Sequence, residues 1–268
     1  MPELPDVQGF VNYFNHTALD KKIAMVSCND EDLIKNTRCP DLQQALHHQQ
    51  FRQASRRGKY LIAEFKKAPH VLVFHFGMTG NLIFGEKLSP NEMKYARLLI
   101  EFEDHSQLIF KDMRQFGKIW LAKNPLEINA LKKMGPEPLN LSHKEFSELL
   151  AKHQQQNIKS FLMDQEIIAG IGNEYSNELL FQSTIDPHQK IKDIDEEKRS
   201  KLYSDMQTIL AKAIEIRKKN KDARKKDLPE DWLLFHQKEM KCPKNPNHKL
   251  KRETIAGRSA IFCPQHQR

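Results

Sequence analysis

The feature that most constrains the fold is a change of periodicity after residue 18. Val7, Phe10, Val11 and Phe14 recur at helical spacing, so residues 3–18 are predicted to form one amphipathic helix with a buried face. After this segment the helical spacing of apolar residues disappears for about a hundred residues. The chain must therefore combine one leading helix with a structure of another kind.

That structure is predicted to be a pair of β-sheets. The short apolar segments between residues 22 and 122 are rich in Ile, Val, Leu, Phe and Tyr, and Gly, Pro, Asn or charged residues separate them. They are residues 22–28, 59–65, 70–75, 81–84, 95–103, 107–111 and 118–122. Short strands at this spacing favour a β-sandwich or a barrel-like sheet pair. The fold class is therefore α+β.

The second half of the chain is predicted to be helical. The prolines of the run 134–139 prevent a continuous helix and place a domain boundary there. Ser142 and Glu145 form a capping-box pattern that begins a helix. Residues 193–217 are predicted to form a long helix. We expect an N-terminal β-sandwich domain, a helical domain and a terminal finger, with boundaries at 1–134, 135–237 and 238–268.

The charge of the chain favours a polyanionic partner. Among 268 residues, 43 Lys and Arg stand against 35 Asp and Glu, a formal charge of +8, which suits nucleic acid better than an anionic membrane surface. We find neither a segment long enough to span a membrane nor a signal peptide. We therefore expect a cytoplasmic protein in which Cys28 and Cys39 are reduced thiols.

The first residues carry two groups with chemical potential. Pro2 favours removal of the initiator methionine, which would leave a secondary amine able to attack an electrophilic sugar carbon and form an iminium. The neighbouring Glu3 could act as general acid or base. The alternative is structural, because Pro2 and Pro5 suit the first turn of a helix and the acidic residues suit its positive end.

Three polar sites lie at strand edges. Residues 56–59 place three cations, Lys59 among them, around a glycine, which is typical of a phosphate contact or of a solvated strand end. His75 begins a turn with two glycines that carries Met78, and Arg114 and Phe116 occupy a second turn. A Met, an Arg and a Phe together could fill the gap left by an extruded nucleotide. Core packing of Met78 and an ordinary hairpin are the alternatives.

The helical region contains a Gly-Ile-Gly-Asn tetrapeptide at 170–173. Its glycines allow close approach to a phosphate, and Asn173 is predicted to cap a helix over 174–184. A packing joint between two helices would explain the same pattern. The charged run 217–226 is either a solvated segment or one that follows phosphates and closes over a bound base.

The last segment is predicted to hold a metal. Cys242, His248, Cys263 and His266 follow a Cys-x5-His-x14-Cys-x2-His spacing, and their thiolates and imidazoles suit tetrahedral zinc. A segment with so little core of its own would gain folding free energy from the ion. Arg258 lies in the hairpin between the two ligand pairs, where it could contact a phosphate. A disulfide or an unliganded loop is the alternative.

Taken together, these motifs resemble the formamidopyrimidine-DNA glycosylase and endonuclease VIII family of base-excision repair enzymes. The matching stretches keep the family's order over almost the whole chain. They are residues 2–5, 56–61, 75–80, 112–117, 135–139 and 170–175, followed by the terminal finger. The retained Met, Arg and Phe resemble the formamidopyrimidine branch, which prefers oxidised purines such as 8-oxoguanine and formamidopyrimidines.

The resemblance implies a role for each matching residue. Pro2 would be the nucleophile at the sugar C1′, Glu3 the acid that opens the sugar ring, and Lys59 a contact near the lesion. The remaining residues that the resemblance assigns to DNA are His75, Met78, Arg114, Phe116, Lys159, Asn173 and Arg258. A base would be excised and the strand then cleaved by β- and δ-elimination through the iminium.

The chain departs from the family in three places. Asp6 keeps an acidic charge that the family has, whereas Gln8 does not. The finger has Asn245 where the second of four cysteines usually stands, so His248 and His266 must replace thiolates if zinc binds. The segment 217–241 lacks the glycine-rich pattern of the region that covers the flipped base.

The expected protein is thus a monomeric DNA glycosylase and abasic-site lyase that acts on duplex DNA and holds one structural zinc ion. Two other readings stay open. One is a non-catalytic nucleic-acid binder that keeps the helices and the finger and has no need of Glu3. The other is a glycosylase for oxidised pyrimidines.

Overall fold

The computed structural model describes residues 1–219, 228–236 and 239–268, and these form two compact units. The first unit comprises residues 1–133 together with the end of helix α8 from Arg217 onward. The second comprises residues 134–216 and the described residues from 228 onward. Within the described part of the chain, no helix combines the length and the apolarity that a membrane span requires.

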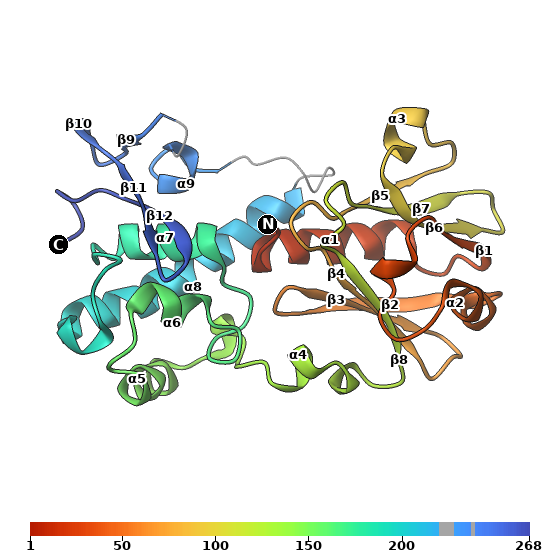
Figure 1. Cartoon of the computed structure of the whole chain (residues 1–268), viewed down its shortest axis with the longest axis horizontal. Helices are drawn as coiled ribbons and strands as arrows, with labels where there is room; N and C mark the ends of the chain where they lie inside the picture. The colour runs from red at the N-terminus through yellow and green to blue at the C-terminus, as the bar shows by residue number, and fades with distance from the viewer. Residues whose placement is uncertain (220–227, 237–238) are drawn as a thin grey trace. The chain divides into compact units, whose positions relative to one another are not determined.

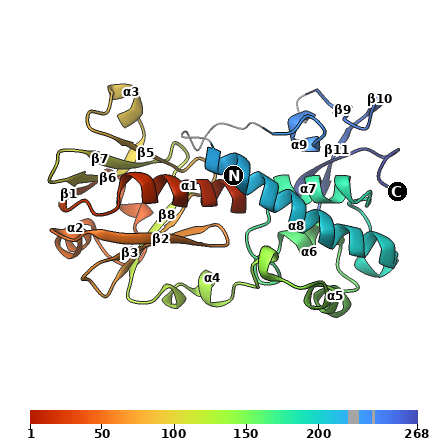
Figure 2. The ribbon, with the colours of Figure 1, turned by 180° about the vertical axis from the view of Figure 1, so that it is seen from behind.

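The first unit begins with helix α1 (Leu4–Thr17), as the periodicity predicted. The ring of Phe10 stacks on Phe76 with 4.1 Å between centroids, and Phe14 meets Phe51 edge-on at 4.8 Å. The helix contacts strands of both sheets, and Figure 2 shows it running between them. The apolar face of α1 therefore closes one side of the core.

Two four-stranded antiparallel sheets make up the rest of this unit, which confirms the predicted pair of sheets (Figure 1). The first sheet contains, in spatial order, β1 (Ile23–Cys28), β6 (Ala96–Phe102), β7 (Gln107–Lys111) and β5 (Asn81–Gly85). The second contains β2 (Phe51–Arg57), β3 (Tyr60–Phe65), β4 (Val71–His75) and β8 (Lys118–Ala122). One buried apolar cluster contains residues of both sheets and of α1.

Strand β2 and helix α2 (Cys39–Leu46) of this unit were not predicted. Strand β2 has the sequence Phe-Arg-Gln-Ala-Ser-Arg-Arg, in which only Phe51 and Ala54 are buried, so its pattern is too polar to read as a strand. Helix α2 buries only Leu42 and Leu46. Both elements owe their form to tertiary contacts more than to local propensity.

The expectation that Cys28 and Cys39 are reduced thiols was wrong, because the structure joins them in a disulfide. Cys28 ends β1 and Cys39 begins α2, and their Cα atoms are 6.0 Å apart. This separation lies in the range that a disulfide requires. The missed helix α2 is the reason for the error, since it returns the chain to the end of β1.

The second unit is built from helices, as predicted. They are α5 (His143–Lys152), α6 (Ile158–Met163), α7 (Asn173–Gln182), α8 (Glu196–Lys219) and the short α9 (Leu233–His236). The capping box that begins α5 is present, because the Glu145 N–H donates to Ser142 Oγ and the Ser142 N–H to Glu145 Oε2. Two further short helices, α3 (Pro90–Met93) and α4 (Asn129–Lys132), belong to the first unit.

The terminal finger consists of two small hairpins, β9 (Lys241–Cys242) with β10 (Asn245–Lys249) and β11 (Lys251–Ile255) with β12 (Arg258–Phe262). Its apolar side chains form only a small cluster, to which Phe181 of α7 and Leu233 of α9 also belong. The finger therefore borrows its core from the neighbouring helices.

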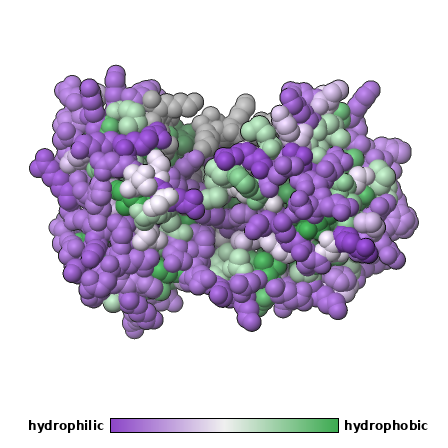
Figure 3. Space-filling model, in the orientation of Figure 1, coloured by the Kyte–Doolittle hydropathy of each residue, from purple (hydrophilic) through white to green (hydrophobic). Residues whose placement is uncertain are grey.

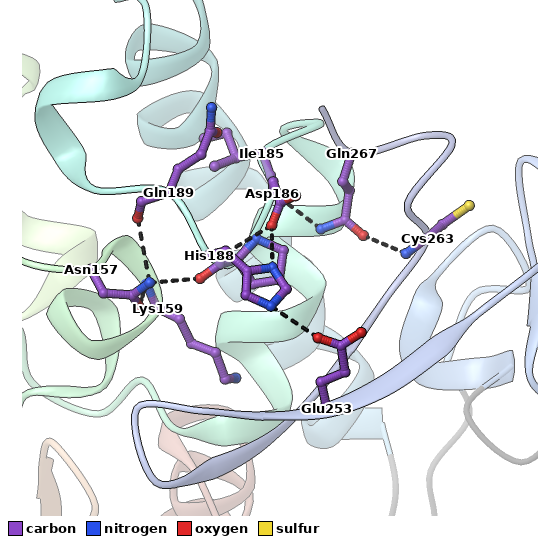
Figure 4. A network of polar contacts seen from close by, with 10 residues as sticks. Asn157, Lys159, Ile185, Asp186, His188, Gln189, Glu253, Cys263 and Gln267 are labelled. Carbon is purple, nitrogen blue, oxygen red and sulfur yellow. Dashed lines mark hydrogen bonds and ion pairs between the residues drawn. The ribbon is translucent and has the colours of Figure 1, made fainter.

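Polar contacts also fasten the finger to the loop that follows α7 (Figure 4). His188 lies between two carboxylates, with Nδ1 2.7 Å from Asp186 Oδ1 and Nε2 3.0 Å from Glu253 Oε2 on β11. The side chain of Gln267 donates to the Ile185 carbonyl and accepts from the Cys263 N–H. These contacts fix the base of the β11–β12 hairpin.

A buried carboxylate holds the segment before the finger. Glu178 of α7 is fully buried, and its Oε2 accepts the Leu234 N–H at 2.8 Å while Oε1 accepts from Gln182 Nε2. Burial raises the pKa of Glu178 to about 7, although the hydrogen bonds from Gln182 and from the α9 backbone oppose the shift. Glu178 is therefore half-protonated near neutral pH.

We expect this carboxyl group to make stability depend on pH. Its pKa is 4.5 when exposed and about 7 in the fold, so folding takes up a proton. The resulting stabilisation, roughly 3 kcal/mol, is complete below the unfolded pKa and is lost as pH rises through the folded pKa. Urea unfolding between about pH 5 and pH 8 measures it.

Glu178→Gln should flatten this dependence, whereas Glu148→Gln, a change at an exposed residue of α5, should leave it intact. The comparison between variants matters because burial lowers the pKa of His75 to about 4, which makes stability rise with pH in an overlapping range. Equal pH profiles for the wild type and Glu178→Gln would contradict the assignment.

Candidate active site and nucleic-acid interface

The N-terminus of α1 positions Pro2 and Glu3. Glu3 is the N-cap residue, is only 1% exposed, and donates its backbone N–H to Asp6 Oδ2 at 3.0 Å. The other oxygen of Asp6 accepts from Arg217 at 2.9 Å (Nε) and 2.8 Å (Nη2). Pro2, next to this anchored residue, is half-buried. Both groups singled out from the sequence thus lie at a restrained helix end.

Lys59 lies in the turn between β2 and β3. Gly58 adopts a φ of 53°, which a glycine reaches without strain, and reverses the chain after Arg57. Arg56 donates to the Gly58 carbonyl at 3.1 Å and to Gln8 Oε1 at 3.2 Å. The predicted strand edge is therefore a hairpin turn, in which Lys59 is 6% exposed.

His75 is a neutral imidazole at the end of β4. Burial, with Lys59 and Lys118 as nearby cations, lowers the pKa of His75 to about 4. The Gly77 N–H donates to its Nδ1 at 3.3 Å, so the ring proton resides on Nε2. His75 therefore offers a hydrogen-bond donor without carrying a charge of its own.

The structure brings together the two turns that carry Met78, Arg114 and Phe116. Gly77 makes this approach feasible, since a Cβ on it would lie 2.4 Å from the Phe116 carbonyl carbon. Met78 is 43% exposed and Phe116 50% exposed, which is unusual for side chains of this size. The Arg114 guanidinium lies 4.9 Å from the Phe116 ring centroid, a cation–π contact.

Asp112 holds these two turns in place, and its role was not predicted from the sequence. Its side chain is fully buried and accepts the Gly117 N–H at 2.7 Å and the Arg114 N–H at 3.3 Å. It also accepts from the Thr79 hydroxyl of the other turn. An acidic residue directly after a buried strand was the available signal, although its burial could not be read from the sequence.

In the second unit, two predicted phosphate contacts lie on α6 and α7. Lys159 is fully buried, and its Nζ donates to Ser176 Oγ at 2.9 Å and to Asn177 Oδ1 at 2.6 Å. Gly172 is the N-cap of α7, so Asn173 is its first residue and not the predicted cap. Among the described residues no hydrogen-bond partner is found for Asn173 Oδ1.

The finger contains a group of side chains able to hold a metal ion. The ligand atoms of Cys242, His248 and Cys263 all lie within 4.8 Å of one another, and both cysteines are buried and free of disulfides. His266 is outside this group, and its Nε2 lies 3.1 Å from the Phe181 carbonyl oxygen. Arg258, the remaining predicted contact of the finger, is exposed at the start of β12.

The predicted covering segment, residues 217–241, is only partly described. Residues 220–227 and 237–238 lie outside the described residues, and so does most of the charged run 217–226. Of the described part, Arg217 bonds to Asp6 and Trp232 is buried among the helices of the second unit.

Comparison with known proteins agrees with this combination of a leading helix, a sheet pair, a helical unit and a Cys/His finger. Residues 1–119 match the formamidopyrimidine-DNA glycosylase N-terminal domain, and residues 134–225 match the formamidopyrimidine-DNA glycosylase H2TH domain. The chain belongs to the formamidopyrimidine-DNA glycosylase family.

Individual relatives extend over the full chain. The formamidopyrimidine-DNA glycosylase of Mycoplasma genitalium is 31% identical over 98% of this chain and 94% of its own. That of Carboxydothermus hydrogenoformans is 32% identical, with each chain covered completely. The structure of Lactococcus lactis Fpg with DNA containing FAPY-dG is 28% identical, with a TM-score of 0.84 over 99% of this chain and 100% of that one.

We expect Asp112→Asn to separate the two turns. An amide in place of the carboxylate points an N–H group at donors that need an acceptor, so the free energy of unfolding should fall by about 1–3 kcal/mol. Urea unfolding measures this loss. Glu86→Gln removes the same charge from an exposed residue after β5 and should scarcely change the free energy of unfolding. Equal losses in the two variants would contradict a role for Asp112 in holding the turns.

Proposed function

We propose that this chain is a DNA glycosylase of base-excision repair that also cleaves the strand at the resulting abasic site. The observation that carries the proposal is the restrained N-terminus, where Glu3 is buried and bonded through its backbone to Asp6 beside Pro2. Family membership supports the same conclusion. The substrate is duplex DNA, for which the formal charge of +8 is suited.

In this mechanism the Pro2 nitrogen, freed by removal of Met1, is the nucleophile. Its lone pair attacks the sugar C1′, and the glycosidic bond breaks so that the base leaves with the bonding electrons. The base takes up the proton that the Pro2 nitrogen loses after the attack. Glu3 protonates the ring oxygen, which opens the sugar and leaves a cationic iminium on Pro2. Loss of a C2′ proton then expels the 3′ phosphate, and a second elimination expels the 5′ phosphate.

The contacts to DNA divide into two kinds. Lys59, the neutral His75, Asn173 and Arg258 would bind phosphates, which fixes the register without reading sequence. Lys159 would do so only if its buried Nζ leaves Ser176 and Asn177. Met78, Arg114 and Phe116 would enter the base stack from their paired turns. The exposure of Met78 and Phe116 supports this second role. The face in Figure 3 is mostly hydrophilic, and its apolar residues form smaller groups.

Oxidised purines are the expected lesions, and oxidised pyrimidines are the alternative. Lactococcus lactis Fpg has been solved both with FAPY-dG DNA and with DNA containing an oxidised pyrimidine. A substrate panel for this chain must therefore contain both kinds of lesion. Excision of purine lesions alone would support the preference inferred from the Met, Arg and Phe set.

The ligand set of the finger fits one structural zinc ion. Two thiolates and one imidazole lie close enough to share a tetrahedral ion, and we assign the fourth position to His266. The ion would bind together the ends of two hairpins that have little core of their own. The ion, bound by Cys242, His248, Cys263 and His266, would thus fix the position of the β11–β12 hairpin that carries Arg258.

Borohydride trapping on a duplex with a single abasic site tests the reaction. We expect a covalent adduct that mass mapping places on Pro2, because reduction converts the iminium to a stable amine. Glu3→Gln should sharply reduce base excision yet leave duplex binding intact. Glu31→Gln, at an exposed residue of the first unit, should change neither base excision nor duplex binding.

Other outcomes of the trapping experiment would separate the rival readings. An adduct on Lys59 would keep the lyase activity but assign the nucleophile to another residue. Tight duplex binding without any adduct, using protein whose Met1 has been removed, would favour the non-catalytic nucleic-acid binder.

Metal analysis tests the finger. We expect about one zinc ion per chain, lost in Cys242→Ser, with cobalt substitution giving the absorption of a tetrahedral site. Chelation should lower the melting temperature, because the ion contributes to folding. His248→Gln and His266→Gln form a matched pair. Zinc retained at full affinity in His266→Gln, but not in His248→Gln, would remove His266 from the ligand set.

A further inference from the structure

The first unit contains a pocket to which the proposed reaction assigns no role. It has a volume of about 440 Å³, and Tyr60, His75, Lys118, Trp120, Glu127 and Asn129 contribute to its walls. Ligand pockets range from about 300 to 1,000 Å³, so a mononucleotide would fit. Of these residues only His75 has a proposed contact to DNA.

The sheet register explains why these side chains meet. Tyr60, His75 and Lys118 are direct neighbours across β3, β4 and β8. Their sequence neighbours Leu61, Phe74 and Ile119 point into the core, so the three side chains point to the opposite face. Trp120 lies two residues after Lys118 and therefore shares that face. Residues 127–130, which follow β8, close the other side of the pocket.

Three rings form one aromatic wall. The ring of Tyr60 lies 4.8 Å from that of His75 and 5.9 Å from that of Trp120, measured between centroids. Tyr60 and Trp120 start from strands on either side of β4 and lean toward each other across it. Both rings are half-buried, so each keeps part of its surface open to the pocket. Such surfaces stack on nucleobases without regard to base identity.

Charged groups lie at opposite sides of this wall. Lys118 is exposed at the rim and is the cross-strand neighbour of His75, whose Nε2–H is a donor. The carboxylate of Glu127 is held by the Lys123 N–H at 3.3 Å on the segment across the pocket. A cation with a neutral donor suits a phosphate, whereas a carboxylate accepts hydrogen bonds from the N–H groups of a base.

We propose that this pocket binds an unstacked nucleotide, with its base against Tyr60 and Trp120 and its phosphate at Lys118. The aromatic rings would stack on the face of the base, and the cation of Lys118 would bind the phosphate. The carboxylate of Glu127 would accept hydrogen bonds from the edge of the base. Neither Met78 nor Phe116, which would enter the base stack, lines this pocket.

The nucleotide has two chemically equivalent sources. It is either a free mononucleotide or the terminal residue of a DNA strand whose neighbouring phosphate lies on His75. The second source rests on the proposed function, because it requires DNA on this edge of the sheet. The first does not.

Tryptophan fluorescence tests the proposal with 2′-deoxyadenosine 5′-monophosphate as the probe. The chain has two tryptophans, Trp120 in the pocket and Trp232 buried in the other unit. We expect stacking to quench the emission of the full chain in a saturable way. Trp120→Phe should abolish the quenching, and Trp232→Phe should not. Quenching that persists in Trp120→Phe would overturn the proposal.

A pair of lysine variants tests the phosphate contact by calorimetry. Lys118→Ala should weaken binding of the mononucleotide about tenfold, the loss expected for one hydrogen bond to a charged group. It should scarcely change the binding of deoxyadenosine, which lacks the phosphate. Lys123→Ala, just beyond the other end of β8, is the matched control and should affect neither. Equal losses in both lysine variants would overturn the assignment.

A 5′-phosphorylated single-stranded trinucleotide distinguishes the two sources. Tighter binding than the mononucleotide, with the same dependence on Trp120 and Lys118, identifies a strand end, and equal binding identifies a free nucleotide. Binding of inorganic phosphate as tight as that of the mononucleotide would refute a base-stacking pocket. Because abasic-site trapping is measured separately, failure here with trapping intact removes the pocket proposal alone.

Discussion

The ion pair between Asp6 and Arg217 is the interaction on which the N-terminal site depends. The Arg217 side chain is almost fully buried, and Asp6 divides its two oxygens between this guanidinium and the Glu3 N–H. Removal of one partner from such a pair leaves a charge away from water. Gly9 leaves room for the Arg217 side chain, since a Cβ at position 9 would lie 3.3 Å from Arg217 Cβ. A residue far along the chain thus orders the backbone that presents Pro2.

Much of the fold could be predicted because its periodicity is strong. The amphipathic pattern of α1, the seven apolar strand segments and the capping box at Ser142 and Glu145 all reappear in the structure. In these elements local propensity and burial favour the same conformation. Strand β2 and helix α2 differ, because few of their residues are buried and tertiary contacts decide their form.

The site was harder to predict than the fold, because its supporting groups have no local signature. The motifs identified Met78, Arg114 and Phe116, but not the burial of Asp112 that joins their turns. Asn173 was predicted to be the N-cap of α7 but is its first residue, since Gly172 is the N-cap. Long-range hydrogen bonds and disulfides depend on the folded path of the chain, which residue type and spacing alone do not reveal.

The close approach at Gly77 also determines how this part of the protein can diversify. Any side chain at position 77 would meet the backbone of Phe116, and any at Gly117 would meet the ring of Phe110. Met78 and Phe116, by contrast, project outward with about half their surface free. Substitutions can therefore exchange the outward side chains while the frame beneath them stays the same. In evolution or engineering, the outward side chains at positions 78 and 116 and the backbone frame beneath them become separable at this edge.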